Sequence, residues 1–354
     1  MPCIWQAGRM PLWAITGGSG FLGLHLARRL LADGTGVRTL DVVPLDAALA
    51  AQGAEGIVGD VRSPREAAAL CRGADVLVHA AAALPARGDP GAIRSVNVEG
   101  TATVLAAAAE AGVRRAVFIS SAVVYGLPES LPLTEGTWTA PIEPYGVSKV
   151  EAERLCREFQ TRGLETVVLR PTAVVGPERL GIFGALFDRV REGRRVYTLG
   201  PGTNCHQLLA VEDLVEAILL AAERPVSGDT FNVGATSFGT AADDLRALIA
   251  HAGSASRVTP LPARPAGLAL RVLALARLSP FSEWHDRTAG RDVYCDVSHA
   301  ERELDWRPRF SNADALIRAY DWHVEHRDGL GGGTGITHRM PWSEKALRLL
   351  RRVS

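Results

Sequence analysis

Short apolar runs alternate with longer amphipathic stretches over the first half of the chain. Runs of this length, separated by stretches of helical periodicity, are typical of a parallel sheet with helices on both faces. We therefore predict an α/β fold built on a doubly wound parallel sheet. The predicted strands are Leu12 to Ile15, Val37 to Val43, Gly56 to Val58, Val76 to His79, Ala116 to Ser120 and Thr166 to Arg170.

A glycine-rich turn follows the first predicted strand directly, and an amphipathic stretch then continues to Ala32. In this strand, turn and helix, Gly17 makes the tight turn, Gly20 lets a pyrophosphate approach the backbone, and Gly23 lets the helix pack closely on the strand. The N-terminus of the helix, at Phe21 and Leu22, is expected to face the phosphates. The pattern predicts a Rossmann-type dinucleotide site.

Asp41 lies 18 residues beyond Gly23, near the end of the second predicted strand. A carboxylate at this place can accept from both hydroxyls of an adenine ribose and would repel a 2'-phosphate, so NAD is favoured over NADP. Arg38 lies three residues earlier, on the opposite face of a strand, and we discount it as a phosphate ligand. The alternative for Asp41 is a solvated charge at the strand end.

Two later strand ends also fit a nucleotide crevice. Asp60 and Val61 follow the third predicted strand, and His79 to Ala82 follow the fourth. Small residues such as Ala80 and Ala81 let a cofactor lie close to the strand. Asp60 is a candidate acceptor for the adenine amino group or, alternatively, a helix N-cap. We interpret His79 as a packed histidine, because no nucleophile near it in the sequence needs activation.

Tyr145 and Lys149 are four residues apart, and Ser121 lies 24 residues before the tyrosine. A helix after Pro144 would stack the phenol and the ammonium on one face. A free tyrosine has a pKa near ~10, so a useful base near neutrality requires a shift of roughly 3 units, about 4 kcal/mol. We expect Lys149 and a positively charged nicotinamide to supply that shift, and Ser121 to hold and polarise the substrate oxygen.

With these motifs in order, the chain resembles the extended short-chain dehydrogenases/reductases, also called the NAD-dependent epimerase/dehydratase family, with some features similar to 3-beta-hydroxysteroid dehydrogenases. The resemblance covers residues 11 to 325. It implies that Tyr145 is the general acid/base, that Lys149 lowers its pKa and binds the nicotinamide ribose, and that Ser121 orients the substrate. It rests on the glycine motif, Asp41, Asp60-Val61, the run from Asn97 to Thr101, Ser121, Tyr145, Lys149 and the run from Leu169 to Thr172.

The resemblance also implies further site residues. Asn97 would lie at the cofactor, and Pro171 and Thr172 would flank the nicotinamide ring. For the substrate we expect contacts from Ala82, Val123, Ala173, His206 and Arg287.

Two departures from the family pattern concern the substrate. Sugar-nucleotide members usually carry an asparagine at the place of Ala173 and an arginine at the place of His206, and both hold the diphosphate. Arg287 and Arg291 resemble a later arginine segment that could still bind a diphosphate, or they are solvated charges. The apolar segment from Leu261 to Phe281, broken by arginines, either covers an apolar substrate or packs on its own domain.

Composition excludes several classes of function. Thirty-nine basic residues balance thirty-nine acidic ones, so no net field attracts nucleic acid. The hydrophobic content of 47% is that of a globular protein, and we identify no integral membrane segment. The five cysteines are scattered without metal-ligand spacing, so we predict reduced thiols, no metal site and a cytoplasmic protein. A homodimer is implied by the family resemblance alone.

The expected organisation is discontinuous. Residues 11–172 would form the NAD-binding domain, with returning segments near 206–234, where strands are predicted at Leu208 to Val211 and Thr230 to Val233. Residues 173–205 and 235–327 would form a smaller C-terminal substrate domain. The remainder, 328–354, is interpreted as a glycine-rich connector and a basic amphipathic tail that docks on its own chain, on another subunit or on a membrane surface. Residues 1–9 precede the fold and are interpreted as an upstream extension.

Three functions fit these observations. The first is an NAD-dependent dehydrogenase or reductase for a bulky secondary alcohol or ketone, favoured by the departures at Ala173 and His206. The second is a nucleotide-sugar epimerase or dehydratase with tightly bound, recycled NAD. The third is a non-catalytic dinucleotide sensor, which the intact set of Ser121, Tyr145 and Lys149 disfavours.

Overall fold

A computed structural model describes residues 10–84, 90–127, 129–262, 283–288 and 290–329. The predictions for residues 1–9, for most of the apolar segment from Leu261 to Phe281 and for the tail beyond Gly329 therefore fall outside the described residues.

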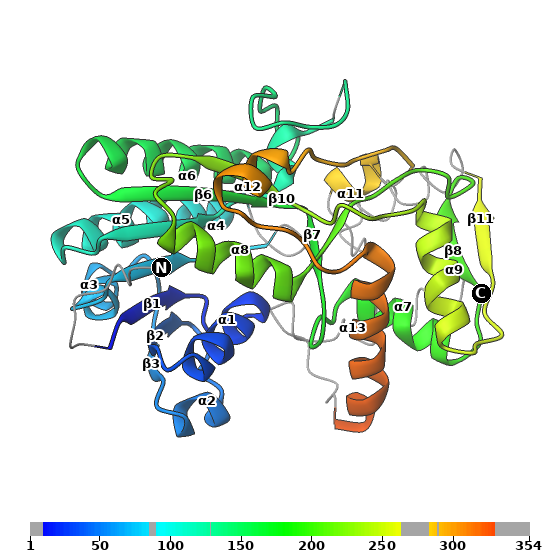
Figure 1. The fold of residues 1–354 in the computed structure, drawn as a ribbon, viewed down its shortest axis with the longest axis horizontal. Helices are drawn as coiled ribbons and strands as arrows, with labels where there is room; N and C mark the ends of the chain where they lie inside the picture. The colour runs from blue at the N-terminus through cyan, green and yellow to red at the C-terminus, as the bar shows by residue number, and fades with distance from the viewer. Residues whose placement is uncertain (1–9, 85–89, 128, 263–282, 289, 330–354) are drawn as a thin grey trace.

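A seven-stranded parallel sheet forms the larger part of the molecule (Figure 1). Its order is β10-β6-β5-β4-β1-β2-β3, which confirms the predicted doubly wound α/β fold. Its strands are β1 (Leu12–Thr16), β2 (Gly36–Asp41), β3 (Glu55–Val58), β4 (Val76–His79), β5 (Arg115–Ile119), β6 (Glu165–Pro171) and β10 (Thr230–Val233).

Helices cover both faces of this sheet. One face carries α1 (Phe21–Ala32), α8 (Val211–Glu223) and α12 (Ser298–Glu303), and the other carries α3 (Pro64–Cys71), α5 (Gly100–Glu110) and α6 (Pro144–Thr161). The shorter helices of this part are α2 (Ala47–Ala51), α4 (Pro90–Arg94), the π-helix η1 (Ser95–Glu99) and the 3-10 helix η2 (Ala122–Tyr125).

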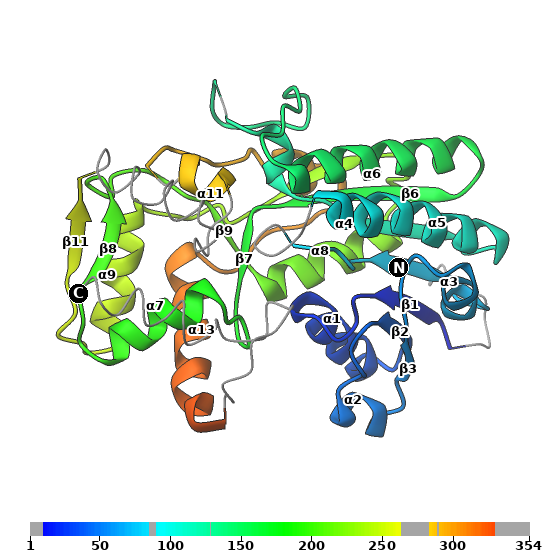
Figure 2. The same cartoon turned by 180° about the vertical axis from the view of Figure 1, so that it is seen from behind.

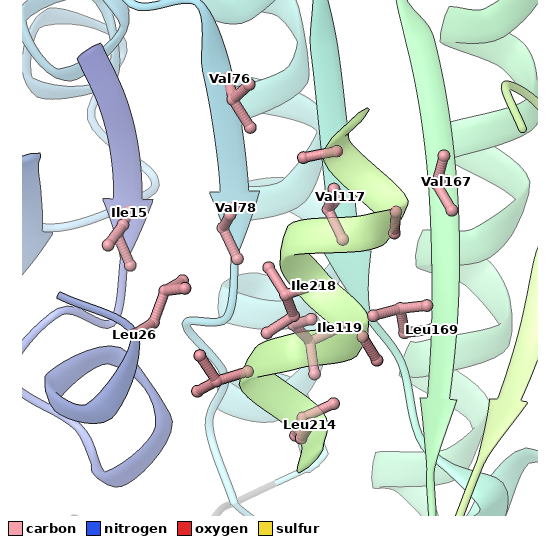
Figure 3. Close-up of a cluster of buried hydrophobic side chains, with 14 of the residues drawn as sticks. Ile15, Leu26, Val76, Val78, Val117, Ile119, Val167, Leu169, Leu214 and Ile218 are labelled. Carbon is pink, nitrogen blue, oxygen red and sulfur yellow. The ribbon is translucent and has the colours of Figure 1, made fainter. Parts of the chain in front are cut away.

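Alternation along each strand sends neighbouring side chains to opposite faces. Trp13 and Ile15 of β1 pack into the core beneath α1 and α8, whereas Ala14 packs into the core beneath α3 and α5. Figure 3 shows the first of these cores, in which Ile119 and Leu169 lie near Leu214 and Ile218 of α8. Because both faces of the central strands β1, β4 and β5 are buried, these strands are short, mainly apolar runs, and this pattern located them in the sequence.

The smaller part contains two pairs of parallel strands, β7 (Ala173–Val175) with β9 (Leu208–Ala210) and β8 (Val196–Leu199) with β11 (Val258–Leu261). The helices around its own apolar core are α7 (Ile182–Arg191), α9 (Ala241–His251) and α13 (Asn312–His326). The short elements α11 (Glu283–Thr288) and η3 (Arg327–Gly329) complete the described chain. Figure 2 shows these helices on the side of the molecule away from β1 to β3.

Several strand boundaries differ from prediction for local reasons. Strand β2 ends at Asp41, because the Asp41 carboxylate accepts from the Val43 amide in a turn. Thr230–Val233 joins the large sheet beside β6, as predicted. Leu208–Ala210 pairs instead with β7, and Val211 already begins α8.

Side-chain caps fix where several helices begin. Ser63 accepts from the Glu66 amide and Pro64 takes the first turn of α3, where its missing N–H costs nothing. Ser311 and Asp314 form a capping box at the start of α13. These caps are local signals, and they place the helices that support the site.

The C-terminal segment closes over the large sheet. The His299 ring of α12 stacks on the Phe231 ring of β10 with centroids 4.8 Å apart. Trp306 donates its indole N–H to the Asp213 carbonyl oxygen of α8 at 2.9 Å. Residues near position 300 therefore complete the core of the dinucleotide-binding sheet.

Candidate active site

The glycine turn has the geometry that the sequence predicts. Gly17 has φ +74°, and a Cβ atom added there would lie 2.9 Å from the Ala81 amide nitrogen. A Cβ atom on Gly23 would lie 2.2 Å from the Gly17 carbonyl oxygen, so only glycine lets α1 pack this closely. Helix α1 begins at Phe21, and its N-terminus faces the turn.

The Asp41 carboxylate lies beside this turn at the end of β2. One of its oxygens accepts from the Ser19 amide at 3.0 Å and the other from the Val43 amide at 3.0 Å. Arg38 lies on the other side of the strand, where it donates to Glu55 at 2.6 Å. This arrangement keeps a carboxylate, and no arginine, at the place expected for the adenine ribose.

The Asp60 carboxylate already has a partner within the protein, which the sequence did not suggest. Arg62 donates to both oxygens of its carboxylate, at 2.9 and 2.6 Å, and this pairing lowers the pKa of Asp60. The N-cap of α3 is Ser63, so the N-cap alternative for Asp60 is wrong. Val61 is buried beside it. An adenine amino group at this place would share the carboxylate with Arg62.

A buried histidine links the glycine strand to the helical layer. Thr16 Oγ1 accepts from the Ala80 and Ala81 amides, so its own proton points to His79 Nδ1, 2.6 Å away. The other ring nitrogen then carries the proton and donates to Thr101 Oγ1 at 2.9 Å. Burial and the nearby Lys149 lower the pKa of His79 to about 3. His79 is therefore a neutral, packed histidine, in line with its interpretation from sequence.

Asn97 continues this chain of hydrogen bonds to the predicted catalytic helix. Thr101 donates to the Asn97 carbonyl, and the Asn97 amide donates to Ser148 Oγ at 3.0 Å. Ser148 in turn donates to the Tyr145 carbonyl oxygen at 2.7 Å. Asn97 also exchanges two hydrogen bonds with the Ala83 backbone and is 2% exposed. The Asn97 side chain thus links two segments of the site, and its polar atoms are used in these hydrogen bonds.

The three predicted catalytic residues come from two neighbouring elements. Ser121 follows β5 and caps η2, where its Oγ accepts from the Val123 amide at 3.3 Å. Tyr145 and Lys149 lie one turn apart in α6, and the Lys149 ammonium is 5.7 Å from the centre of the Tyr145 ring. Lys149 donates to the Ile119 carbonyl oxygen at 2.8 Å. The helical spacing expected from the sequence is present.

The protein groups around Tyr145 act on its pKa in opposite directions. Burial and the nearby carboxylate of Glu143 raise the pKa of the phenol, and Arg179 partly opposes them. Burial also lowers the pKa of Lys149 to about 8. The protein groups alone therefore keep the phenol protonated near neutrality, because desolvation outweighs the nearby cations. The expected lowering of the phenol pKa was for Lys149 together with a positively charged nicotinamide, and it stays a prediction for the protein with NAD bound.

A buried ion pair holds together the elements that carry the predicted catalytic residues. Arg170 donates to both oxygens of Glu153, at 2.9 and 2.6 Å, and Glu153 is 1% exposed. Ser120 donates to the same carboxylate at 2.6 Å, and Arg170 donates to Tyr125 Oη at 2.9 Å. The pair therefore fixes the end of β5, just before Ser121, to α6 and β6.

The residues expected around the nicotinamide leave one polar atom unsatisfied. Thr172 Oγ1 is buried and has no hydrogen-bond partner among the described residues. Pro171 ends β6 directly before it. A buried hydroxyl without a partner is costly, and the carboxamide of a nicotinamide would satisfy it. This atom therefore fits NAD, which the glycine turn, Asp41 and Thr172 would hold.

The predicted substrate residues are less closely grouped. Ala173 is exposed in β7, whereas Ala82 and Val123 are partly buried next to the strand ends. His206 donates a ring N–H to the Thr288 carbonyl oxygen at 2.9 Å and so anchors α11. Arg287 is exposed on that helix. The geometry gives His206 a structural contact to the backbone of α11.

Arg179, in the loop between β7 and α7, was not predicted as a site residue. Its guanidinium carbon lies 5.3 Å from the centre of the Phe21 ring, in the glycine motif, and 5.9 Å from that of Phe183. It is also the cation that acts on Tyr145. The only sequence signal was a Gly-Pro turn after a short apolar run, and the folded loop is needed to place this residue at the site.

Other predicted absences concern the described part of the chain alone. Within it, no group of three or more histidine, cysteine or acidic residues is arranged to hold a metal ion. No helix among the described residues is long and apolar enough to cross a membrane. Cys71, Cys156, Cys205 and Cys295 are free thiols.

The sequence profile described as the NAD dependent epimerase/dehydratase family matches residues 13–234. The chain belongs to this family. Members of the family use NAD, in agreement with the glycine turn and Asp41. The resemblance stated from the motifs is thereby confirmed at the level of the family.

Three curated proteins illustrate its relatives. The uncharacterised protein y4nG of Sinorhizobium fredii is 35% identical over 95% of this chain and 84% of its own length. A 4-hydroxy-2-methyl-3-oxo-4-farnesyl-3,4-dihydroquinoline-1-oxide ketoreductase of Stigmatella aurantiaca is 32% identical over 85% of this chain and 93% of its own. A UDP-glucose 4-epimerase of Mycolicibacterium smegmatis is 28% identical over 87% and 97%.

Among solved structures, MoeE5 in complex with UDP-glucose and NAD superposes with a TM-score of 0.72. It is 26% identical to this chain, and the alignment covers 90% of this chain and 99% of MoeE5. The likeness extends through the smaller part of the fold, beyond the region that the family profile matches.

Proposed function

We propose that this protein is a nucleotide-sugar epimerase or dehydratase that keeps NAD bound through its catalytic cycle. The observation that carries the hydride-transfer part is the grouping of Ser121 with Tyr145 and Lys149, and the buried, unsatisfied Thr172 hydroxyl supports a nicotinamide cofactor. The choice of a nucleotide sugar is supported by likeness to a UDP-glucose 4-epimerase and to MoeE5 with UDP-glucose, in each case over nearly the whole of the relative. This reverses the order in which the sequence ranked the two enzyme hypotheses.

Each of the three predicted catalytic residues has its own role in the proposed reaction. Ser121 Oγ would hold the oxygen of the reacting secondary alcohol, and Tyr145 Oη would take the hydroxyl proton as the hydride leaves the same carbon. Bound NAD supplies the site that accepts and returns the hydride. Lys149, held by the Ile119 carbonyl, would stabilise the phenolate while it carries no proton. In the return step, Tyr145 gives the proton back to the oxygen of the reduced ketone.

A second candidate is an NAD-dependent ketoreductase for a bulky apolar ketone. Two observations favour it, namely the absence of the expected diphosphate ligands at Ala173 and His206, and the 32% identity to the Stigmatella ketoreductase. In that reaction the hydride passes in one direction and the oxidised cofactor must leave. Retention of NAD therefore separates the two candidates.

The test is to denature freshly purified protein and quantify the released nicotinamide, and then to incubate holoprotein with UDP-glucose and examine the sugar by NMR. An epimerase or dehydratase should retain close to one NAD per chain and convert the sugar without added cofactor. Freely exchanging NAD, with turnover only when a ketone and NADH are supplied together, would replace the proposal by the ketoreductase. A protein without either activity would contradict both.

A further inference from the structure

Arg179 is a partly buried arginine whose guanidinium makes no ion pair within the described ranges. Its Nε atom is inaccessible to solvent and makes no hydrogen bond to any described residue. The guanidinium stacks near the Phe21 and Phe183 rings instead. Burying a cation in this way is costly unless an anion compensates it.

The carboxylate next to Arg179 in the chain does not compensate it. Glu178 is buried and pairs with Arg28 of α1. Burial lowers the pKa of Arg179 to about 10, with only the Tyr145 phenol acting in the opposite direction. Glu178, the one carboxylate of this loop, therefore pairs with Arg28, and the guanidinium charge of Arg179 is left without a counter-ion among the described residues.

Arg170 shows what a compensated arginine in the same protein looks like. It is also withdrawn from water, and burial alone would lower its pKa, yet the pairing of its guanidinium with both oxygens of Glu153 raises the pKa of Arg170. Both arginines reach the region of the catalytic residues. Of these two arginines, only Arg170 has a counter-ion among the described residues, which indicates that the counter-ion of Arg179 is a ligand.

The position of Arg179 shows which part of a ligand it would meet. Its guanidinium lies 5.3 Å from the centre of the Phe21 ring, at the N-terminus of α1, and its charge is close enough to act on Tyr145, where the reacting hydroxyl is expected. The phosphates of the cofactor already have the amides of the α1 N-terminus as partners. A guanidinium that also acts on the phenol is therefore placed for an anion close to the reacting carbon.

Resting on the proposed function, we infer that Arg179 binds an oxyanion close to the reacting carbon of the substrate, so that the preferred nucleotide sugars carry a carboxylate on the sugar ring. The planar guanidinium suits a two-point contact with a carboxylate. The same chemistry could come from the cofactor pyrophosphate, and the binding experiment below separates the two sources.

The test compares two probes that differ only at the sugar C6, UDP-glucuronate and UDP-glucose. Their affinities are measured by calorimetry on NAD-loaded Tyr145→Phe protein, which binds without turnover, alone and with Arg179→Gln or Arg179→Lys added. The matched control is Arg191→Gln, which removes the same charge from the exposed end of α7. NAD affinity is measured for every variant.

With Arg179 intact, UDP-glucuronate should bind roughly tenfold or more tightly than UDP-glucose, as expected for a charge-assisted pair. Arg179→Gln should abolish this preference, Arg179→Lys should keep part of it, and Arg191→Gln should leave it intact. Equal binding of the two sugars to protein with Arg179, or a preference that survives Arg179→Gln, would refute the inference and leave the proposed function standing. Failure to bind either sugar would refute both. A loss of NAD affinity confined to the Arg179 variants would assign the oxyanion to the cofactor and refute its assignment to the substrate.

A second measurement needs no substrate. Because an uncompensated buried charge destabilises the fold, the thermal midpoint of Arg179→Gln protein freed of nucleotide should equal or exceed that of the parent. A structural arginine would behave in the opposite way, so a midpoint several degrees lower would contradict a ligand-binding role.

Discussion

Lys149 donates its ammonium proton to the carbonyl oxygen of Ile119, 2.8 Å away and two residues before Ser121. One hydrogen bond thus ties the helix that carries the predicted acid/base to the strand end that carries the predicted substrate-binding serine. Its consequence is that the ammonium cannot move toward the phenol without releasing β5.

The charge of Lys149 predicts an alkaline limit to activity. Burial lowers the pKa of Lys149 to about 8, so the ammonium is lost as the pH rises through that value, and kcat/KM should fall with a midpoint near pH 8. A pH profile of kcat/KM measures this fall, which forms the alkaline limb of the profile. The substitution Lys149→Arg keeps the positive charge at high pH and should remove the limb, although at a lower kcat. A limb that persists unchanged in this variant would assign it to another group.

Tyr145→Phe should reduce turnover by at least ~100-fold, because no group remains to move the hydroxyl proton. NAD affinity should be retained, since the phenol oxygen is not part of the glycine turn. Steady-state kinetics and NAD titration measure the two effects. Tyr197→Phe, in β8 and away from the site, is the control. Near-normal turnover in the Tyr145 variant would remove this residue from the mechanism.

Asp41→Ala should weaken the preference for NAD over NADP. The carboxylate lies at the end of β2, held by the Ser19 and Val43 amides, where it would repel a 2'-phosphate. The ratio of the two dissociation constants is the readout. Glu55→Ala, which removes the partner of Arg38 on the neighbouring strand, is the control. An unchanged ratio in the Asp41 variant would show that another group selects the cofactor.

Glu153→Gln should lower the free energy of unfolding by about 3–5 kcal/mol, because it leaves the buried Arg170 without a counter-ion. Glu158→Gln breaks an exposed pair with Arg162 in the same helix and should change it by less than about 1 kcal/mol. Urea unfolding measures both. Replacing Arg170 by methionine in the Glu153 variant should recover part of the loss, and similar losses in the two single variants would argue against the buried pair as the cause.

His79 predicts a loss of stability in acid. Its pKa in the folded protein is about 3, below its ordinary value of 6.5, so the unfolded chain binds the extra proton first. Stability should therefore fall as the pH drops from 6.5 toward 3. His79→Gln should flatten this dependence, whereas His251→Gln at the exposed surface should leave it unchanged. Unfolding midpoints at several pH values would show the difference, and equal slopes in the three proteins would contradict it.

Much of the fold was predictable because its signals are local. The buried strands read as apolar runs, and the glycines are required by close contacts, since a Cβ atom on Gly23 would lie 2.2 Å from the Gly17 carbonyl oxygen. The helical spacing of Tyr145 and Lys149 is likewise a property of a single element.

The rest of the site depends on contacts between distant segments. No pattern in the sequence shows that Glu178 turns toward Arg28 and leaves Arg179 uncompensated. Nor does any pattern show that His206 donates a hydrogen bond to the Thr288 carbonyl oxygen, 82 residues later in the chain. The effect of burial on the pKa of Tyr145 could not be predicted for the same reason, because desolvation is a sum over all surrounding segments.

The stacking of His299 on Phe231, and the hydrogen bond from Trp306 to Asp213, bear on how the protein is synthesised. The edge strand β10 gains part of its cover from residues near position 300, so most of the chain must be synthesised before the nucleotide-binding sheet is complete. Nascent chains that end at residue 172 or 234 would expose apolar surface. The sheet and the C-terminal segment therefore mature as one cooperative unit, and a nucleotide-binding fragment cut at either boundary should depend on chaperones.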